Sequence, residues 1–253
     1  MTASSRFAGK TALVTGAGGG IGRAIALALA AEGATVMAVG RSLERLTETV
    51  NLSADRRGSA YVCDIGDAAA MRQLQSRIQD TYRGLDVLVC NAATGVNARF
   101  HETAVADLDA VIATNIRGTY LCLQSGIRLM LQSGGGAIVV VGSLGALRPA
   151  PRASSYGMSK AATHAMARHA AIEYAREGIR VNVVAPGATD TDLLAGADDD
   201  VRASVANAIP DGAIASPEQV AKIALFLACR ESDHVTGQVW SIDGGASVGA
   251  PGR

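Results

Sequence analysis

One stretch near the N-terminus decides the fold: Thr11-Ala12-Leu13-Val14-Thr15-Gly16-Ala17-Gly18-Gly19-Gly20-Ile21-Gly22. Its first five residues form a short uncharged run typical of a buried strand, and helical spacing of apolar residues starts at Ile21. The glycines between them let the backbone turn tightly and approach a pyrophosphate, whose charge the amides and dipole of a helix N-terminus can meet. The spacing G-x-x-x-G-x-G differs from the more common G-x-G-x-x-G, and a purely structural turn is the alternative. The strand-turn-helix context favours a phosphate-binding turn with these contacts: Gly16, Gly18, Gly19, Gly20, Ile21 and Gly22.

The same alternation of strand and helix continues along the chain. Short, mostly uncharged, valine-rich runs are typical of strands buried on both faces, and segments with helical spacing separate them. Ser216 and Pro217 mark the start of one such helix. This pattern predicts an α/β protein with a parallel sheet, right-handed crossovers and helices on both faces. The predicted strands are Thr11–Thr15, Thr35–Val39, Ala60–Cys63, Val87–Cys90, Ala137–Val141, Arg180–Val184 and Val239–Ile242.

Composition limits the domain organisation and the partners. Of 253 residues, 49% are hydrophobic and 18% charged, so the chain can bury a large core. No linker, repeat or low-complexity segment divides it, which predicts one domain over residues 1–248 and a loose tail, Gly249–Arg253. The 23 Lys and Arg residues balance the 23 Asp and Glu residues, so neither nucleic acid nor an anionic membrane is an expected partner. The apolar runs are too short for a signal peptide or a membrane span, and we expect a soluble cytoplasmic protein.

The cysteines and histidines carry little signal. The four cysteines lie far apart with no C-x-x-C pair, so we expect reduced, buried thiols, with a reactive thiol at Cys90 as the alternative. No histidine has a neighbour at metal-ligand spacing, and no metal site is predicted. The acidic run Asp198–Asp200 is interpreted as a solvated stretch. The cysteines are Cys63, Cys90, Cys122 and Cys229, and the histidines are His101, His164, His169 and His234.

The second half of the chain carries a candidate for proton transfer. Tyr156 and Lys160 are four residues apart at the start of a predicted helix, so their side chains share one face. A free tyrosine has a pKa near 10, and a nearby cation such as Lys160 would stabilise its phenolate and bring it into use near neutrality. Ser143, at the end of the fifth strand, can hydrogen-bond the same substrate oxygen. An exposed tyrosine–lysine pair without function is the alternative reading of this spacing alone.

An ordered set of motifs resembles the short-chain dehydrogenase/reductase family. The set spans nearly the whole chain and ends in Thr236-Gly237-Gln238 and Asp243-Gly244-Gly245, which resemble the family's C-terminal strand. The resemblance implies a single Rossmann-like, doubly wound domain with a seven-stranded parallel sheet, a nicotinamide cofactor, and hydride exchange with a ketone or secondary alcohol. The motifs are Thr15-Gly16 with Gly20-Ile21-Gly22, Asn91-Ala92, Asn115, Ser143, Tyr156 with Lys160, and Pro186-Gly187 with Thr191.

The resemblance also implies roles for single residues. Tyr156 is similar to the family's catalytic acid/base, and Ser143 to the residue that positions the substrate oxygen. Lys160 would lower the pKa of Tyr156 and bind the nicotinamide ribose, and Asn115 would hold a water in a proton relay to Lys160. The remaining implied cofactor contacts are Asp64 and Ile65 at the adenine, Asn91 and Ala92 at the adenosine ribose, and Pro186, Gly187, Thr189 and Thr191 at the carboxamide.

The chain departs from the family pattern at two places. Cys90-Asn91-Ala92-Ala93 stands where the family often reads Asn-Asn-Ala-Gly, and Asp211-Gly212-Ala213 stands where an arginine is frequent. The implied substrate pocket comprises Thr94–Arg99, Leu144–Ser155 and a lid at about residues 188–209. Its lining mixes apolar side chains with two arginines, so an apolar ketone and a β-ketoacyl thioester both stay open as substrates. The named lining residues are Leu144, Leu147, Pro149, Leu193, Leu194, Arg148 and Arg152.

The residues after the second predicted strand bear on cofactor choice. A fold of this kind that prefers NAD carries a carboxylate about 20 residues beyond the glycine turn. Here the strand ends in Gly40-Arg41-Ser42, where Arg41 and the Ser42 hydroxyl can meet the 2′-phosphate of NADP. NADP is therefore the predicted cofactor. NAD stays open, because the glycine turn has Gly19 where many NADP-dependent members carry a basic residue.

Two further expectations concern assembly and function class. The predicted helices at about Val105–Gln132 and Tyr156–Arg176 carry apolar or small residues on more than one face, which indicates a subunit interface. By resemblance the assembly is a homotetramer, with a homodimer or a monomer as alternatives. The predicted function is an NADP-dependent oxidoreductase, and a 3-oxoacyl-type reductase is one candidate within that class. An NAD-dependent secondary-alcohol dehydrogenase and a non-catalytic dinucleotide-sensing module are the alternatives.

Overall fold

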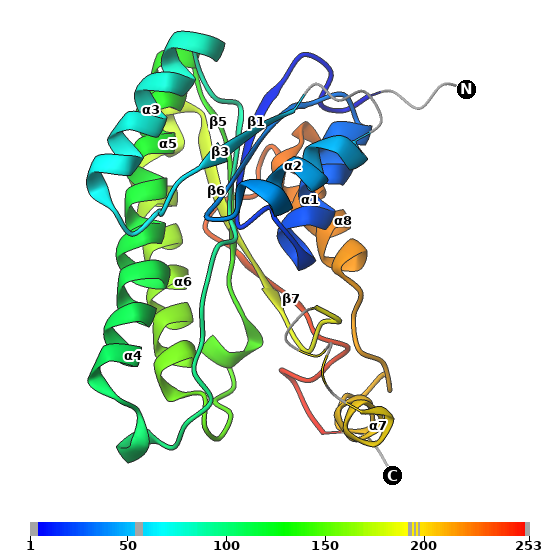
Figure 1. Cartoon of the computed structure of the whole chain (residues 1–253). Coiled ribbons are helices and arrows are strands. Elements are labelled where there is room, and N and C mark those ends of the chain that lie inside the picture. Colours follow the sequence, from blue (N-terminus) through cyan, green and yellow to red (C-terminus); the bar gives the residue numbers. More distant parts are fainter. Residues whose placement is uncertain (1–4, 54–57, 192–193, 195, 197, 251–253) are drawn as a thin grey trace.

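The computed structural model, which describes residues 5–53, 58–191, 194, 196 and 198–250, is built on one sheet (Figure 1). The sheet has seven strands in the order β3-β2-β1-β4-β5-β6-β7, and every neighbouring pair is parallel. The strands are β1 (Thr11–Thr15), β2 (Thr35–Gly40), β3 (Ser59–Val62), β4 (Val87–Cys90), β5 (Gly136–Val141), β6 (Ile179–Pro186) and β7 (Val239–Ile242). This confirms the predicted fold class and all seven predicted strands.

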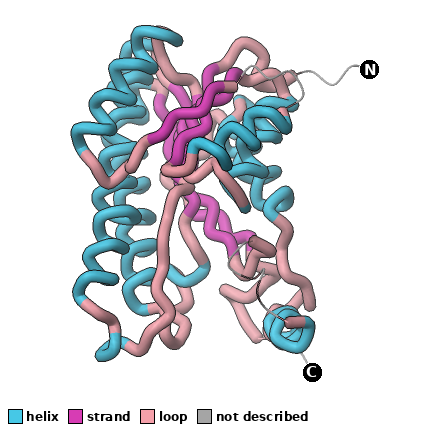
Figure 2. Tube along the Cα trace, viewed as in Figure 1, coloured by secondary structure: helices cyan, strands magenta, loops and turns pink. Residues whose placement is uncertain are grey.

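Helices cover both faces of the sheet (Figures 1 and 2). On one face lie α1 (Gly20–Ala31), α2 (Leu43–Leu52) and α8 (Pro217–Ala228). On the other lie α3 (Ala68–Tyr82), α4 (Val105–Val111), α5 (Thr119–Ser133) and α6 (Ser154–Tyr174). A short helix, α7 (Asp199–Asn207), stands apart from these layers. The α8 start is as predicted, since Ser216 caps it, Gln219 completes the capping box and Pro217 is its first residue.

The core is split by the sheet into two clusters, which explains the valine-rich strands. Ala12 and Val14 of β1 belong to the cluster with Ile25 of α1. Leu13, which points to the opposite face, belongs to the cluster with Ile127 of α5. After the first residue of β1 and of β5, the residues of these strands and of β4 are buried on one side of the sheet or the other, and uninterrupted apolar runs result.

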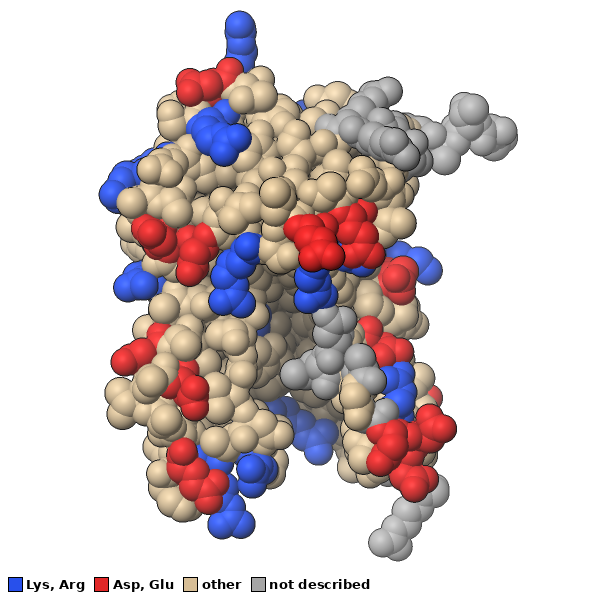
Figure 3. Space-filling model, viewed as in Figure 1, with Lys and Arg blue, Asp and Glu red and all other residues tan. Residues whose placement is uncertain are grey.

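The strand order places the candidate site. The chain moves outward from β1 to β2 and β3, then returns to pair β4 with the other side of β1. Loops after β1 and β4 therefore diverge and leave a crevice beyond the carboxyl ends of these two strands, where α/β folds bind ligands. The space-filling view shows the surface hollowed there, between the side of α4 and α6 and the side of α7 (Figure 3).

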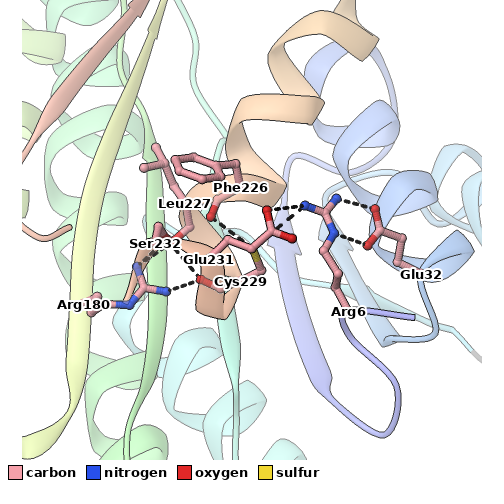
Figure 4. Close-up of polar contacts among 8 residues, drawn as sticks. All are labelled: Arg6, Glu32, Arg180, Phe226, Leu227, Cys229, Glu231 and Ser232. Carbon is pink, nitrogen blue, oxygen red and sulfur yellow. Dashed lines mark hydrogen bonds and ion pairs between the residues drawn. The ribbon is translucent and has the colours of Figure 1, made fainter. Parts of the chain in front are cut away.

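A partly buried arginine joins several segments at the amino end of the sheet (Figure 4). Arg180, near the start of β6, donates from Nη1 to the Leu227 carbonyl at 2.8 Å and to Ser232 Oγ at 2.9 Å. Its Nη2 donates to the Cys229 carbonyl at 2.9 Å. These carbonyls end helix α8, so Arg180 satisfies acceptors that the helix itself leaves unpaired. Arg6, in the same view, instead forms a half-exposed ion pair with Glu32.

Two further findings concern the described part of the chain. None of its helices has the length and apolarity to cross a lipid bilayer. Cys63, Cys90, Cys122 and Cys229 are free and buried, as predicted. The predicted lid and tail include residues 192–193, 195, 197 and 251–253, which lie outside the described residues, and Leu193 is among them.

Candidate active site

The glycine turn after β1 is shaped so that side chains do not fit. Gly16 and Gly20 have φ of +67° and +49°, the left-handed region that glycine tolerates best. A Cβ on Gly22 would lie 2.2 Å from the Gly16 carbonyl oxygen, and one on Gly16 would lie 2.7 Å from Asn91 Nδ2. Helix α1 begins at Gly20, and no side chain from the described residues caps it. Its first amides are therefore available to a pyrophosphate, and the turn fits the dinucleotide that the sequence predicts.

Asn91 fastens this turn to the end of β4. Its Nδ2 donates to the Thr15 and Gly16 carbonyls at 3.0 and 3.3 Å. The backbone amides of Asn91 and Ala92 both donate to Thr15 Oγ1, at 3.0 and 3.1 Å. The structure thus gives Asn91 a clear scaffold role, whereas the implied ribose contact of Asn91 and Ala92 stays a prediction.

Helices α1 and α2 support the turn from behind, which the sequence reasoning missed. Thr49 Oγ1 donates to the Ala17 carbonyl at 2.8 Å, and Arg23 Nη2 donates to the Gly18 carbonyl at 2.8 Å. Arg45 Nε reaches the same Gly18 carbonyl at 3.1 Å. Thr49 and Arg45 lie about one helical turn apart on α2, and only the packing of α2 against the turn reveals their role.

Residues that follow β2 and β3 lie where the sequence places them. Arg41 is exposed directly after β2. Ser42 is the N-cap of α2, and its Oγ accepts the Arg45 amide hydrogen at 3.4 Å. Asp64 is exposed after β3 and its Oδ1 accepts from the Gly66 amide at 2.9 Å, while Ile65 is buried. The Arg41 side chain is therefore open to a ligand, whereas the Ser42 hydroxyl is already used in a cap.

The structure brings together three of the four predicted catalytic side chains at the end of β5. Tyr156 and Ser143 share a side-chain hydrogen bond. Ser143 Oγ also accepts from the Gly145 amide at 3.0 Å. Lys160 is buried, with its Nζ donating to the Val141 carbonyl at 2.7 Å and lying 5.7 Å from the centroid of the Tyr156 ring. Lys160 and Tyr156 therefore share a helix face, as their spacing predicts.

Burial dominates the titration of this pair. It raises the pKa of Tyr156, and the hydrogen bond with Ser143 opposes the rise. Burial also lowers the pKa of Lys160 to about 8. The ammonium of Lys160 donates to Val141, and its expected effect on the pKa of Tyr156 stays a prediction. With its pKa raised by burial, Tyr156 is a protonated phenol at neutral pH.

Asn115 lies close to this group, in a segment of π-helix. Residues Ile112–Gly118 form that segment, between α4 and α5, where the sequence predicts one continuous α-helix. Asn115 Nδ2 donates to the Thr94 carbonyl at 2.8 Å and to Ser159 Oγ at 2.9 Å, and its Oδ1 accepts from the Thr94 amide at 2.8 Å. The sequence reasoning missed Ser159, which is fully buried and joins Asn115 to the Tyr156 carbonyl at 2.7 Å. The proton relay itself stays a prediction.

The segment after β6 closes the site from the other side of the crevice. Gly187 pairs with β7 through a bond from its amide to the Ile242 carbonyl at 2.9 Å, and Thr189 Oγ1 donates to the Gly187 carbonyl at 3.2 Å. A Cβ on Gly20 would lie 3.2 Å from Thr191 Cγ2, so Thr191 lies directly over the glycine turn. The predicted carboxamide-binding segment, which begins at Pro186, therefore borders the predicted phosphate site.

The implied substrate side of the site is tied down by polar contacts. Arg202 of α7 pairs with Asp190 at 2.6 Å, which joins the described part of the lid to the segment after β6. Arg152 Nε donates to Asn97 Oδ1 at 2.8 Å, and Arg148 Nη1 donates to the Ala246 carbonyl at 2.6 Å. Both pocket arginines are therefore engaged within the chain.

Comparisons with known proteins agree with this geometry. The family model described as enoyl-(acyl carrier protein) reductase matches residues 16–247. The chain is 37% identical to 3-oxoacyl-(acyl-carrier-protein) reductase FabG of Thermotoga maritima, over 96% of this chain and 100% of that protein. It is 41% identical to cis-4-hydroxycyclohexanecarboxylate dehydrogenase of Sinomonas cyclohexanicum, over 94% of this chain and 97% of that one. The crystal structure of levodione reductase superposes with a TM-score of 0.90 at 29% identity, covering 95% of this chain and 98% of that one.

A nucleotide-binding turn at the same edge of the sheet as a partly buried tyrosine and a buried lysine defines an oxidoreductase that acts on alcohols and ketones with a nicotinamide cofactor. This chain belongs to the short-chain dehydrogenase/reductase family.

Proposed function

We propose that this protein reduces a ketone to a secondary alcohol with NADPH, and catalyses the reverse oxidation. The observation that carries the proposal is the position of Tyr156, Ser143 and Lys160 beside the glycine turn, with Thr191 over that turn. When bound, the nicotinamide supplies or accepts the hydride.

The residues of the site would divide the remaining work. Ser143 and Tyr156 hold the carbonyl oxygen, and the Tyr156 hydroxyl gives it a proton as the alkoxide forms. The raised pKa of Tyr156 keeps that proton in place at neutral pH, which suits reduction. Lys160 holds the nicotinamide ribose, and Asn115 positions the water through which the proton is replaced.

The choice of NADP rests on the end of β2. Arg41 is exposed there, neither of its sequence neighbours Gly40 and Ser42 is a carboxylate, and a guanidinium pairs well with a phosphate. Arg45 adds a second cation, since its Nε lies 3.1 Å from the Gly18 carbonyl at the edge of the turn. This arrangement supplies from α2 the positive charge that the glycine turn lacks at Gly19. An NAD-dependent secondary-alcohol dehydrogenase is the second candidate, because the Ser42 hydroxyl is used as a helix cap.

The substrate is proposed at the level of its class. Relatives are named for a 3-oxoacyl-carrier substrate and for a hydroxycyclohexanecarboxylate. Arg148 and Arg152 each donate a hydrogen bond within the chain and stay exposed beside the apolar residues of the pocket. We favour an apolar or cyclic ketone because the relative named for a cyclic alcohol has the higher identity, 41% against 37%.

The test is a panel of cyclic ketones, β-ketoacyl thioesters and the corresponding alcohols, assayed by nicotinamide absorbance with NADPH and NADH in parallel. We expect ketone-dependent oxidation of NADPH, faster with the cyclic ketones than with the thioesters. Binding of NADPH without turnover on any member would favour the dinucleotide-sensing module.

We also propose a cytoplasmic homotetramer whose chains each act as one domain over residues 1–248. Apolar side chains are exposed along the helices that the sequence predicts at the interface, with Val105 73%, Tyr120 56% and Ile172 81% exposed. Light scattering at micromolar concentration should give a tetramer, and a single 25.7 kDa species would contradict it.

A further inference from the structure

The end of β5 is held by a histidine that the proposed chemistry does not use. Lys160 and His164 are four residues apart on α6, and both side chains reach the segment Val141–Ser143. Lys160 Nζ donates to the Val141 carbonyl at 2.7 Å. His164 Nε2 accepts from the backbone amide of Ser143 at 3.5 Å. Tyr156, Lys160 and His164 therefore lie on one face of α6, each one helical turn after the last.

The Ser143 amide has lost its strand partners. The ladder between β5 and β6 ends at the pair Val141 and Val184, and the Gly142 amide makes the last bond on that side, to the Val184 carbonyl at 2.7 Å. On the other side, β4 pairs only as far as Cys90 with Val140, after which the chain turns toward Thr15. Successive amides of a strand point to opposite sides, so the Ser143 amide lies beyond both ladders and His164 provides its acceptor.

The backbone is built to admit this imidazole. A Cβ on Gly142 would lie 2.1 Å from His164 Nε2 and 2.7 Å from Val183 Cγ1, so a side chain at position 142 would displace the ring. His164 is 7% exposed. Burial, and secondarily the Lys160 ammonium, lower the pKa of His164 to about 4. The imidazole is therefore neutral at working pH, with a lone pair on Nε2 to accept the hydrogen.

We propose that His164 is a positioning residue, which fixes the Ser143 hydroxyl toward Tyr156 by holding the Ser143 backbone amide. The inference rests on the proposed catalytic role of Ser143. Two hydrogen bonds hold Ser143. Its side-chain Oγ accepts from the Gly145 amide at 3.0 Å, and its backbone amide donates to His164 Nε2 at 3.5 Å. A displacement of even a fraction of an ångström at Ser143 would misplace the substrate oxygen.

The first measurement compares two substitutions of the same residue. His164→Leu keeps an apolar side chain of similar size and removes the acceptor, and we expect kcat to fall about tenfold with the KM for NADPH within about twofold. His164→Gln places an amide oxygen near the position of Nε2, and kcat should return to within about threefold of the wild type. His169→Leu, at an exposed position on the same helix, is the matched control and should leave kcat unchanged. If His164→Leu does not fold, His164→Asn, whose amide is too short to reach the amide of Ser143, replaces it.

A double-mutant cycle separates positioning from a general structural effect. In Ser143→Ala, which retains the backbone amide but has no hydroxyl to position, His164→Leu should lower kcat no further. Losses that multiply in the double variant, or a His164→Gln enzyme as slow as His164→Leu, would overturn the inference. Full activity of Ser143→Ala alone is a different result, because it would overturn the proposed role of Ser143 and the inference with it.

Discussion

The two ends of the same sheet bury polar groups in different ways. At the amino end, the Arg180 guanidinium donates hydrogen bonds to the Leu227 and Cys229 carbonyls and to Ser232. At the carboxyl end, Lys160 is buried more deeply than Arg180, yet within the described part of the chain only one of its three N–H donors has a partner, the Val141 carbonyl. Arg180 thus uses several donors to hold parts of the fold together, whereas Lys160 is buried with donors to spare and is placed for a ligand.

This difference predicts a separation of effects. Substitutions at the carboxyl end should lower the rate and leave stability nearly unchanged. Substitutions at the amino end should lower stability and leave the rate unchanged.

The largest effect is expected for Tyr156→Phe. The substitution keeps the ring and removes the proton that the substrate oxygen receives, so kcat should fall by about 10²–10⁴-fold. The dissociation constant for NADPH and the midpoint of urea unfolding should stay close to those of the wild type. Steady-state kinetics, fluorescence titration and circular dichroism measure the three quantities. A variant with nearly full kcat would remove Tyr156 from its proposed role.

Arg180→Leu tests the amino end. It removes the guanidinium donors from the carbonyls of Leu227 and Cys229 and leaves Ser232 as their donor, and we expect the free energy of unfolding to fall by about 1–3 kcal/mol with kcat unchanged. The matched control is Arg6→Ala, which breaks the half-exposed pair with Glu32 and should cost less than about 1 kcal/mol. Urea unfolding at one protein concentration provides both values. A loss of kcat at unchanged stability in Arg180→Leu would contradict the comparison.

The pH dependence of kcat/KM tests whether Lys160, at the carboxyl end of the sheet, must carry its charge. The kcat/KM for NADPH reports ionisations of the free enzyme. Burial lowers the pKa of Lys160 to about 8, so Lys160 loses its proton as the pH rises through 8, whereas the raised pKa of Tyr156 keeps the phenol protonated. Ketone reduction should therefore be level from about pH 6 to 7.5 and fall above pH 8. A profile that rises with pH, or stays level to pH 10, would show that Lys160 is not required as a cation.

A smaller effect is expected for Arg41→Ala. Its exposed guanidinium would meet the 2′-phosphate in water, where such a contact is weakened, and we expect the preference for NADPH over NADH to fall about tenfold. The comparison is the ratio of kcat/KM values for the two nucleotides. Arg72→Ala, at an exposed position on α3, is the control and should leave the ratio unchanged. A wild-type preference for NADH would instead support the NAD-dependent alternative.

Much of the fold could be predicted because its signals are local. The bounds of β1, β4 and β7 follow from runs of valine and other apolar residues that end in turn residues. β6 continues to Pro186, beyond its predicted end at Val184, because β7 pairs with its last residues. The π-helical segment at Asn115 was missed, since its apolar spacing resembles that of the helices on either side.

The site, too, could be predicted from the sequence only where its signals are local. Tyr156, Lys160 and the glycine turn are recognisable from spacing within one segment. Thr49 and Ser159 act through hydrogen bonds between segments far apart in the chain, which no local pattern encodes. The raised pKa of Tyr156 was missed for a related reason, since spacing identifies Lys160 as its neighbour but does not give the burial of either group.

The most direct test of the central claim follows the hydride itself. The fastest ketone of the panel is reduced in ordinary water with NADPH deuterated on one or the other face of the nicotinamide C4, and the alcohol is examined by mass spectrometry. Because the segment from Pro186 to Thr191 would fix the ring, the account predicts that deuterium from one face alone appears on the carbinol carbon. Deuterium that stays in the nucleotide from both faces, or an alcohol that carries only solvent hydrogen at that carbon, would contradict hydride transfer at this site.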